Sequence, residues 1–162
     1  MSIAVVGAQE CAGAFLERDE WIPMSVTWEP RSSGRPLYLR ISGVNGGEVE
    51  LKIDPLNGML TQLIVIIPPP QVENRHSALP VLQVQGQAPV IDRSPWGWVE
   101  TPDSAEPHKS IAETVENLGF IQDPDIIGVT FSDEAPARHV RCEGVTVGVS
   151  SAGSLVQITA CL

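Results

Sequence analysis

Hydrophobic and polar residues alternate along several short segments of this chain. In residues 48–54 (EVELKID) every second residue from valine onward is apolar, and residues 37–41 (LYLRI) and 145–149 (VTVGV) repeat the pattern. Side chains of a β-strand point alternately to its two faces, so this period of two predicts half-buried antiparallel strands. Glycine, proline and asparagine separate the segments and predict tight turns between them.

Two longer segments, 25–66 and 128–161, have similar sequences in the same order. Residues 49–53 align with 145–149, and GMLTQL at 58–63 aligns with GSLVQI at 153–158. All gaps in the alignment fall in predicted turns. We expect an internal repeat of a four-stranded meander; the alternative is a chance similarity between hairpins of like composition.

The spacing of Leu60, Leu63 and Val65 departs from strict alternation and predicts a β-bulge just after the turn at 54–58. The apolar positions of both segments form the predicted core: Val26, Leu39, Ile41, Val49, Leu51, Ile53, Leu60, Leu63, Val129, Val140, Val145, Val147, Val149, Leu155 and Ile158.

Between the two similar segments, the sequence predicts a proline-rich connection followed by a short helix. Eight of the 14 prolines lie in the connection 68–107, and a short edge strand is expected there near 81–84. In KSIAETVENLGF the apolar residues Ile111, Val115 and Leu118 have helical spacing before Gly119, which predicts a short helix. The alternative is a strand through 114–121 that pairs with IIGVTF at 126–131.

These patterns predict one domain over residues 1–162 with a mainly β fold. We expect two antiparallel β-meander repeats packed as a sandwich or a partly open barrel, with one or two short helices.

Composition narrows the classes of function. The chain has 162 residues, 43% of them hydrophobic, which is enough for a packed core, and a formal net charge of −10. This charge repels phosphates and anionic lipids, so we expect neither nucleic acid nor membrane binding, and a basic protein as partner. Three cysteines and an N-terminus without signal-peptide features predict thiols in a reducing environment and a cytoplasmic protein.

Catalytic and metal-binding motifs are weak in this sequence. His76 and His108 have no nearby cysteine, and His139 and Cys142 are three apart, which on a strand places them on opposite faces. There is no Gly-x-Ser-x-Gly motif and no phosphate-binding glycine loop before a helix. We therefore expect no metal, no cofactor and no catalysis, with an unrecognised carboxylate enzyme as an alternative.

Charge placement is the most distinctive feature. Residues 100–134 contain nine acidic residues and one lysine, directly after the two tryptophans of SPWGWVE. An acidic field steers a basic partner, and tryptophan can anchor that partner. The alternative is a solvated acidic face whose tryptophans pack over the core. The expected partner-binding residues are Trp96, Trp98, Glu100, Asp103, Glu106, Glu113, Glu116, Asp123 and Asp125.

The hairpins LKIDPLNGMLTQLIVI and VTVGVSSAGSLVQI, in a short acidic chain, resemble in style the bacterial immunity proteins of toxin–immunity systems. The resemblance implies that the chain binds and inhibits a cognate toxin domain, often by covering its active site. It assigns no individual residue. The alternative in another class is a structural or scaffold component of a bacterial assembly.

Overall fold

The computed structural model describes residues 2–30, 34–74, 82–101 and 109–162, and these residues form β-strands and connecting turns without a helix. The described part of the chain therefore has no helix with the length and apolar character needed to cross a bilayer. The mainly β prediction is confirmed. The strands are β1 (Val5–Glu10), β2 (Gly13–Glu17), β3 (Met24–Glu29), β4 (Leu37–Gly43), β5 (Glu48–Ile53), β6 (Leu60–Ile67), β7 (Leu82–Gln85), β8 (Gln87–Ile91), β9 (Val99–Thr101), β10 (Lys109–Glu116), β11 (Gly119–Gln122), β12 (Ile126–Thr130), β13 (Arg138–Cys142), β14 (Val145–Val149) and β15 (Leu155–Cys161).

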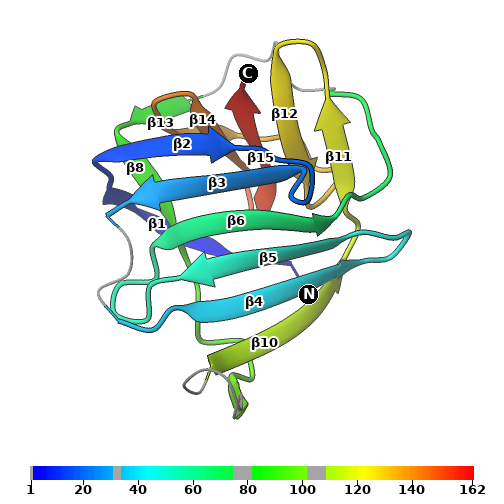
Figure 1. The fold of residues 1–162 in the computed structure, drawn as a ribbon. Helices are drawn as coiled ribbons and strands as arrows, with labels where there is room; N and C mark the ends of the chain where they lie inside the picture. The colour runs from blue at the N-terminus through cyan, green and yellow to red at the C-terminus, as the bar shows by residue number, and fades with distance from the viewer. Residues whose placement is uncertain (1, 31–33, 75–81, 102–108) are drawn as a thin grey trace.

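Two large sheets form two layers (Figure 1). The front sheet has the strand order β2-β3-β6-β5-β4-β10-β9, and the rear sheet has the order β11-β12-β15-β14-β13-β7. A small third sheet pairs β1 with β8. In each large sheet one strand is added in parallel, β10 beside β4 and β7 beside β13, while the other pairs are antiparallel.

The two similar segments have the same strand order in their sheets. Residues 25–66 supply β3-β6-β5-β4, and residues 128–161 supply most of β12-β15-β14-β13. On the first side of the meander each sheet has one further strand, β2 beside β3 and β11 beside β12; on the other side the front sheet adds β10 and β9 and the rear sheet adds β7.

The hairpins β5–β6 and β14–β15 both contain a glycine with positive φ in the turn. Gly58 and Gly153 adopt φ of 77° and 83°, a left-handed conformation that favours glycine. The N–H of Gly58 donates to the carbonyl of Asp54 at 2.9 Å, and the N–H of Gly153 donates to that of Ser150 at 3.0 Å.

A β-bulge follows both turns, as the sequence predicts for the first. The register passes from Lys52↔Gln62 to Ile53↔Leu60 in one hairpin, which leaves Thr61 as the extra residue. In the other hairpin it passes from Gly148↔Gln157 to Val149↔Leu155, with Val156 as the extra residue. The bulge switches the alternation of each second strand, so that the residues on both sides of it can face the core.

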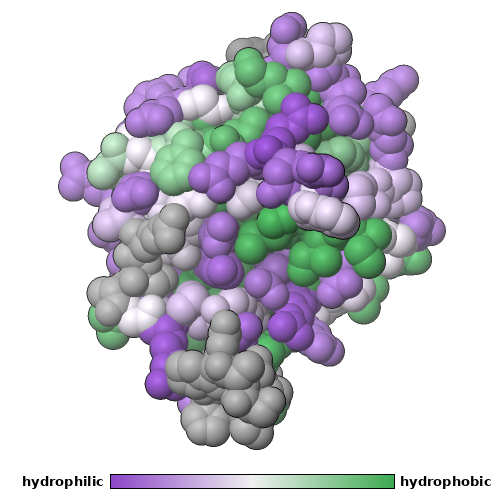
Figure 2. All heavy atoms as spheres, viewed as in Figure 1, coloured by the Kyte–Doolittle hydropathy of each residue, from purple (hydrophilic) through white to green (hydrophobic). Residues whose placement is uncertain are grey.

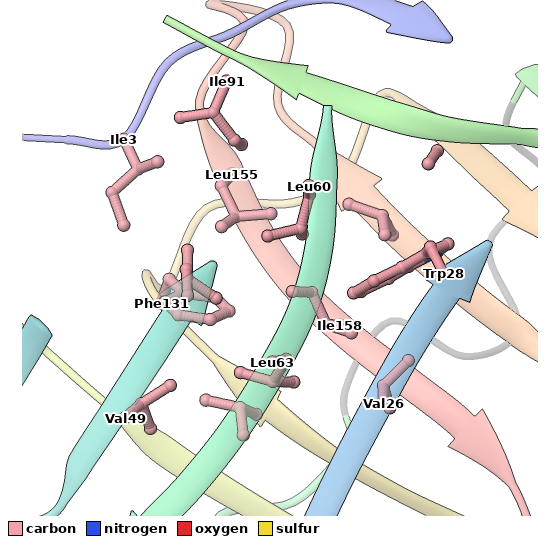
Figure 3. Close-up of a cluster of buried hydrophobic side chains, with 14 of the residues drawn as sticks. Ile3, Val26, Trp28, Val49, Leu60, Leu63, Ile91, Phe131, Leu155 and Ile158 are labelled. Atoms are coloured by element: carbon pink, nitrogen blue, oxygen red, sulfur yellow. The ribbon is translucent and has the colours of Figure 1, made fainter. Parts of the chain in front are cut away.

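Buried side chains of both large sheets form one hydrophobic cluster. In Figure 3, Val26, Leu60 and Leu63 of the front sheet lie close to Leu155 and Ile158 of the rear sheet. All 15 residues of the predicted core are at most 2% exposed, so this prediction is confirmed. Trp28, Met24 and Phe131 enlarge the core beyond the predicted set.

The predicted helix over residues 109–121 is wrong. Lys109–Glu116 is strand β10, paired in parallel with the whole of β4, and Gly119–Gln122 is strand β11, paired with β12 as in the alternative interpretation. Ala112 is buried while Val115 is 59% exposed, so the segment alternates with period two. The neighbouring strand provides backbone partners along its length, which outweighs a helical spacing of only three apolar residues.

The expectation of three free thiols is also wrong. Cys11, between β1 and β2, and Cys142, the last residue of β13, form a disulfide with Cα atoms 6.8 Å apart. They are separated by 131 residues, so the sequence spacing gave no indication of the pair. The bond ties the β1–β2 connection to the rear sheet. Cys161 is free and exposed.

Truncating a core side chain should lower the free energy of unfolding much more than truncating an exposed one. Leu51→Ala empties a completely buried position, and we expect it to lower the free energy of unfolding by about 2–4 kcal/mol. Leu56→Ala, at a site 77% exposed in the β5–β6 turn, should change it by less than about 0.5 kcal/mol. Urea unfolding followed by circular dichroism measures both. Equal losses would show that the cluster around Leu51 is not the cooperative core.

The disulfide closes a long loop and should stabilise the fold by restricting the unfolded chain. We expect the double variant Cys11→Ser/Cys142→Ser to lose about 2–4 kcal/mol of unfolding free energy. Cys161→Ser should have no comparable effect, because that side chain is exposed and unpaired as a thiol. Thermal unfolding with and without reductant gives a second measurement, in which reductant should lower the Tm of the wild type but not of the double variant.

Candidate partner-binding surface

The two tryptophans of the SPWGWVE loop are held against the protein. Trp96 is 7% exposed, and its indole N–H donates to the carbonyl of Asp92 at 3.0 Å. Trp98 is partly buried against the core, and its indole N–H donates to the carbonyl of Arg93 at 2.9 Å. The expectation that both are exposed anchors is therefore wrong for Trp96, since its burial and hydrogen bond make it part of the core.

The acidic residues expected to form one surface lie in two places. Glu100 is on β9, and Glu113 and Glu116 are on the adjoining strand β10, at one edge of the front sheet. Asp123 and Asp125 are exposed in the turn between β11 and β12, in the rear sheet. Asp103 and Glu106 lie outside the described residues. The acidic segment of the sequence is thus divided by the path of the chain into an edge and a turn.

Glu116 differs from the other carboxylates of the edge. Its Oε1 atom is buried without a hydrogen-bond partner among the described residues, and this burial raises the pKa of the Glu116 carboxyl above its usual value. Glu113, three residues earlier, is exposed. At this edge, burial therefore disfavours the charged form of Glu116, and a hydrogen bond from Thr114 offsets part of this effect on its pKa.

The most exposed aromatic side chain of the described residues is Trp21, which is 83% exposed in the turn between β2 and β3. The carboxylate of Asp19 braces this turn: its Oδ1 accepts the N–H of Trp21 at 2.7 Å and that of Ile22 at 2.6 Å. In addition, the N–H of Asp19 donates to the carbonyl of Ile22 at 3.1 Å. The turn holds the backbone of Trp21 in place while its ring is open to solvent.

Apolar and acidic groups surround Trp21. The pairing Met24↔Val65 places the turn beside the end of β6, where Ile66 and Ile67 are 43% and 53% exposed. Figure 2 shows hydrophobic residues gathered over that end of β6, bordered by hydrophilic ones.

A hollow of about 440 Å³ adjoins the turn, lined in part by Asp19, Glu20, Phe120 and Gln122. Gln122 directly precedes Asp123 in the β11–β12 turn. We refer to residues 18–23, Ile66, Ile67, Phe120 and Gln122 as the Trp21 surface; the β11–β12 turn begins directly after Gln122.

Sequence reasoning missed Trp21 because its neighbours along the chain carry no long acidic run. The stretch RDEWIP nevertheless contains a usable signal, an aspartate two residues before tryptophan and a proline two residues after it. Aspartate commonly accepts backbone N–H groups two and three residues ahead in such turns. The link to Asp123 and Ile66 could not be seen, because it depends on the pairing of β3 with β6 and on the packing of β11.

The described residues contain no group of three or more metal-ligating side chains. His139 and Cys142 lie on opposite faces of β13, as the sequence indicates, with Cys142 in the disulfide. His76 and His108 fall outside the described residues.

No protein-family model matches this chain, and a search of curated proteins finds no match either.

The raised pKa of Glu116 predicts that its contribution to stability depends on pH. Because the folded-state pKa of Glu116 is raised, ionisation costs stability at pH 7 and the cost disappears below about pH 4, where both states are protonated. Glu116→Gln should therefore raise the Tm at pH 7 and have little effect near pH 4. Glu113→Gln is the matched control on the same strand. A gain for Glu116→Gln that is equal at both pH values would contradict this explanation.

Proposed function

We propose that this protein is a non-catalytic binding module that neutralises a basic protein partner through the Trp21 surface. The observation that carries the proposal is the 83% exposed Trp21 on a turn braced by Asp19. An exposed tryptophan exposes apolar area that solubility does not require, and tryptophan is a favoured anchor in protein interfaces. Bracing the turn lowers the entropy lost when a partner orders it.

Charge supports the choice of a basic partner. Asp19 and Glu20 precede the tryptophan and outnumber Arg18 of the same surface, and Asp123 and Asp125 lie in the turn after Gln122, in a chain with a formal net charge of −10. Such a field accelerates the approach of a positively charged protein and weakens with salt. The acidic edge formed by Glu100, Glu113 and Glu116 contributes to the same field from a second position and belongs to the proposal as a steering region.

The partner class that we propose is a bacterial toxin domain, because of the resemblance of the hairpins to immunity proteins. Neutralisation would then mean that the partner's functional surface is covered, with no reaction carried out by this chain. A scaffold role is the second candidate, and one observation favours it. Strand β9 pairs only with residues 109–111 of β10, so residues 112–116 have no outer neighbour among the described strands and could receive a strand from another protein.

We also propose that the two large sheets derive from one duplicated meander and pack as a sandwich. The support is the shared strand order, the positive φ of Gly58 and Gly153, and the bulges at Thr61 and Val156. A duplication would keep such backbone features while side chains diverge. Superposition of the two four-stranded units in an experimental structure tests the common origin.

The disulfide bears on the cellular compartment in which the protein would bind its partner. A cytoplasmic location is what the sequence predicts, whereas the Cys11–Cys142 bond favours an oxidising compartment. Counting free thiols in protein taken directly from the source cells separates the two: three thiols would support the cytoplasm, and one would support an oxidising compartment.

Partner capture followed by kinetics tests the proposed surface. The tagged protein is used to isolate its partner from the source cells, the partner is identified by mass spectrometry, and binding is measured by surface plasmon resonance. Trp21→Ala should raise the dissociation rate by about 30-fold or more, as expected for an anchor worth at least 2 kcal/mol. Leu56→Ala removes another highly exposed apolar side chain, from the turn at the start of β6, and should leave the rate unchanged.

Charge-reversal variants show which acidic residues accelerate association with the partner. The pair Glu20→Lys/Asp123→Lys should slow association more than Glu100→Lys/Glu113→Lys, and added salt should slow the wild type in the same way. A captured partner whose binding is insensitive to Trp21→Ala and to salt would exclude the Trp21 surface. If only the Glu100/Glu113 pair has an effect, the β9–β10 edge is the binding site instead.

A further inference from the structure

A polar pocket lies on the outer face of the rear sheet, away from the core. Along β13, Val140 and Cys142 are buried in the core, so the alternate residues His139 and Arg141 point to the other face. The register places Thr146 beside Arg141 and Thr159 beside Thr146. Together with Asn74 and Gln157, these residues line a pocket with a volume of about 190 Å³.

Beside the pocket, one position between two of its lining residues lacks a side chain. Gly148 lies between His139 and Gln157 in the register. A Cβ atom there would come within 3.1 Å of the Gln157 side chain, 3.2 Å of the Pro136 side chain and 3.7 Å of the His139 ring. Glycine therefore lets Pro136, His139 and Gln157 pack closely around this position.

Several polar groups of this pocket are buried without partners. His139 is 9% exposed, Gln157 5% and Thr159 8%. Among the described residues, four buried side-chain atoms have no hydrogen-bond partner, and three of them belong to pocket residues: His139 Nε2, Arg141 Nε and Asn74 Oδ1. Each unsatisfied buried group costs about 1–3 kcal/mol, so a cluster of three calls for a ligand or ordered water.

The charge of the pocket is opposite to that of the protein as a whole. None of the described side chains that line it is a carboxylate, although the chain contains 20 acidic residues. Arg141 supplies a permanent positive charge, and among the described residues its Nη1 donates to Gln83 Oε1, at 3.5 Å. Burial, followed by the charge of Arg141, lowers the pKa of His139, so that its imidazole is neutral at pH 7 and can accept or donate one hydrogen bond.

We propose that this pocket binds a small molecule through a carboxylate or phosphate group held by the Arg141 guanidinium, with the hydroxyls of Thr146 and Thr159 as neighbouring donors. Asn74 Oδ1 and His139 Nε2 then bind a hydroxyl or amine on the same molecule. The volume of about 190 Å³ is below that of sites for drug-sized ligands, which fits a compound of a few heavy atoms, such as a hydroxy acid or inorganic phosphate. This binding is independent of the proposed protein partner.

Water is the competing occupant, since a polar pocket of this size could hold several molecules. Affinity for an oxyanion distinguishes the two, because water alone produces no saturable signal. The probes are inorganic phosphate, L-lactate and L-malate, titrated separately into the intact protein at pH 7 and followed by calorimetry and by two-dimensional amide NMR. We expect at least one of them to bind at a single site, with the largest shifts at the amides of β13, β14 and β15.

Two arginines of β13 provide matched variants. Arg141→Gln removes the charge that lines the pocket and should weaken binding about 10- to 100-fold, as for a lost hydrogen bond to a charged group. Arg138→Gln removes the same charge from the same strand, but Arg138 does not line the pocket and should change affinity by less than about twofold. Thr146→Val replaces a hydroxyl by a methyl group of similar size and tests the pocket if Arg141→Gln proves unstable.

Cys161 gives a second measurement that does not depend on a variant. It lines the pocket and is the free, exposed cysteine, so the bound probe should slow its alkylation by iodoacetamide. Absence of saturable binding up to about 10 mM for all three probes, a range that includes very weak ligands, would show that the pocket holds water only. Equal losses in Arg141→Gln and Arg138→Gln would also overturn the proposal, because they would indicate general attraction of anions.

Discussion

The register of the two glycine-turn hairpins is the constraint on which the rest of the structure depends. A shift of one residue would exchange the two faces of a strand. A shift of β13 against β14 would likewise turn Val140 and Cys142 away from the core and bring His139 and Arg141 into it. The disulfide would then be lost and a charge would be buried. The turns at Gly58 and Gly153 and the bulges beyond them keep the alternate apolar residues of β5, β6, β14 and β15 on the inner face.

The same alternation separates surfaces of different character. Core residues from both sheets occupy the inner faces, which leaves the outer faces free to differ in charge and chemistry. The Trp21 surface combines an exposed aromatic ring with carboxylates at one end of β6. The outer face of the rear sheet instead carries a pocket with an arginine, a neutral histidine and no carboxylate among its described lining residues. A partner protein and a small anion could therefore be bound without competing for the same groups.

The disulfide and strand β10 show how distant parts of the chain stabilise one another. Cys11 and Cys142 are joined across 131 residues, and β10 lies in parallel beside β4, about 70 residues earlier in the chain. Contacts of this kind carry a large entropic cost of loop closure. Both contacts lie against the shared hydrophobic core, which includes Cys142 and Ala112.

The sequence by itself determined the mainly β class, the first bulge and the core, because each follows from local periodicity and turn residues. Val49, Leu51 and Ile53 face the core wherever the strand is placed, provided that one face is buried. Only the tertiary structure decided that 109–116 is a strand, that Trp96 is buried while Trp21 is exposed, and that the acidic residues are divided between two places. It also decided that His139, Arg141 and Asn74 meet in one pocket. These outcomes depend on which strands become neighbours, and that choice is made by the burial of whole sheet faces, a property of the assembled sheets that no short stretch of sequence contains.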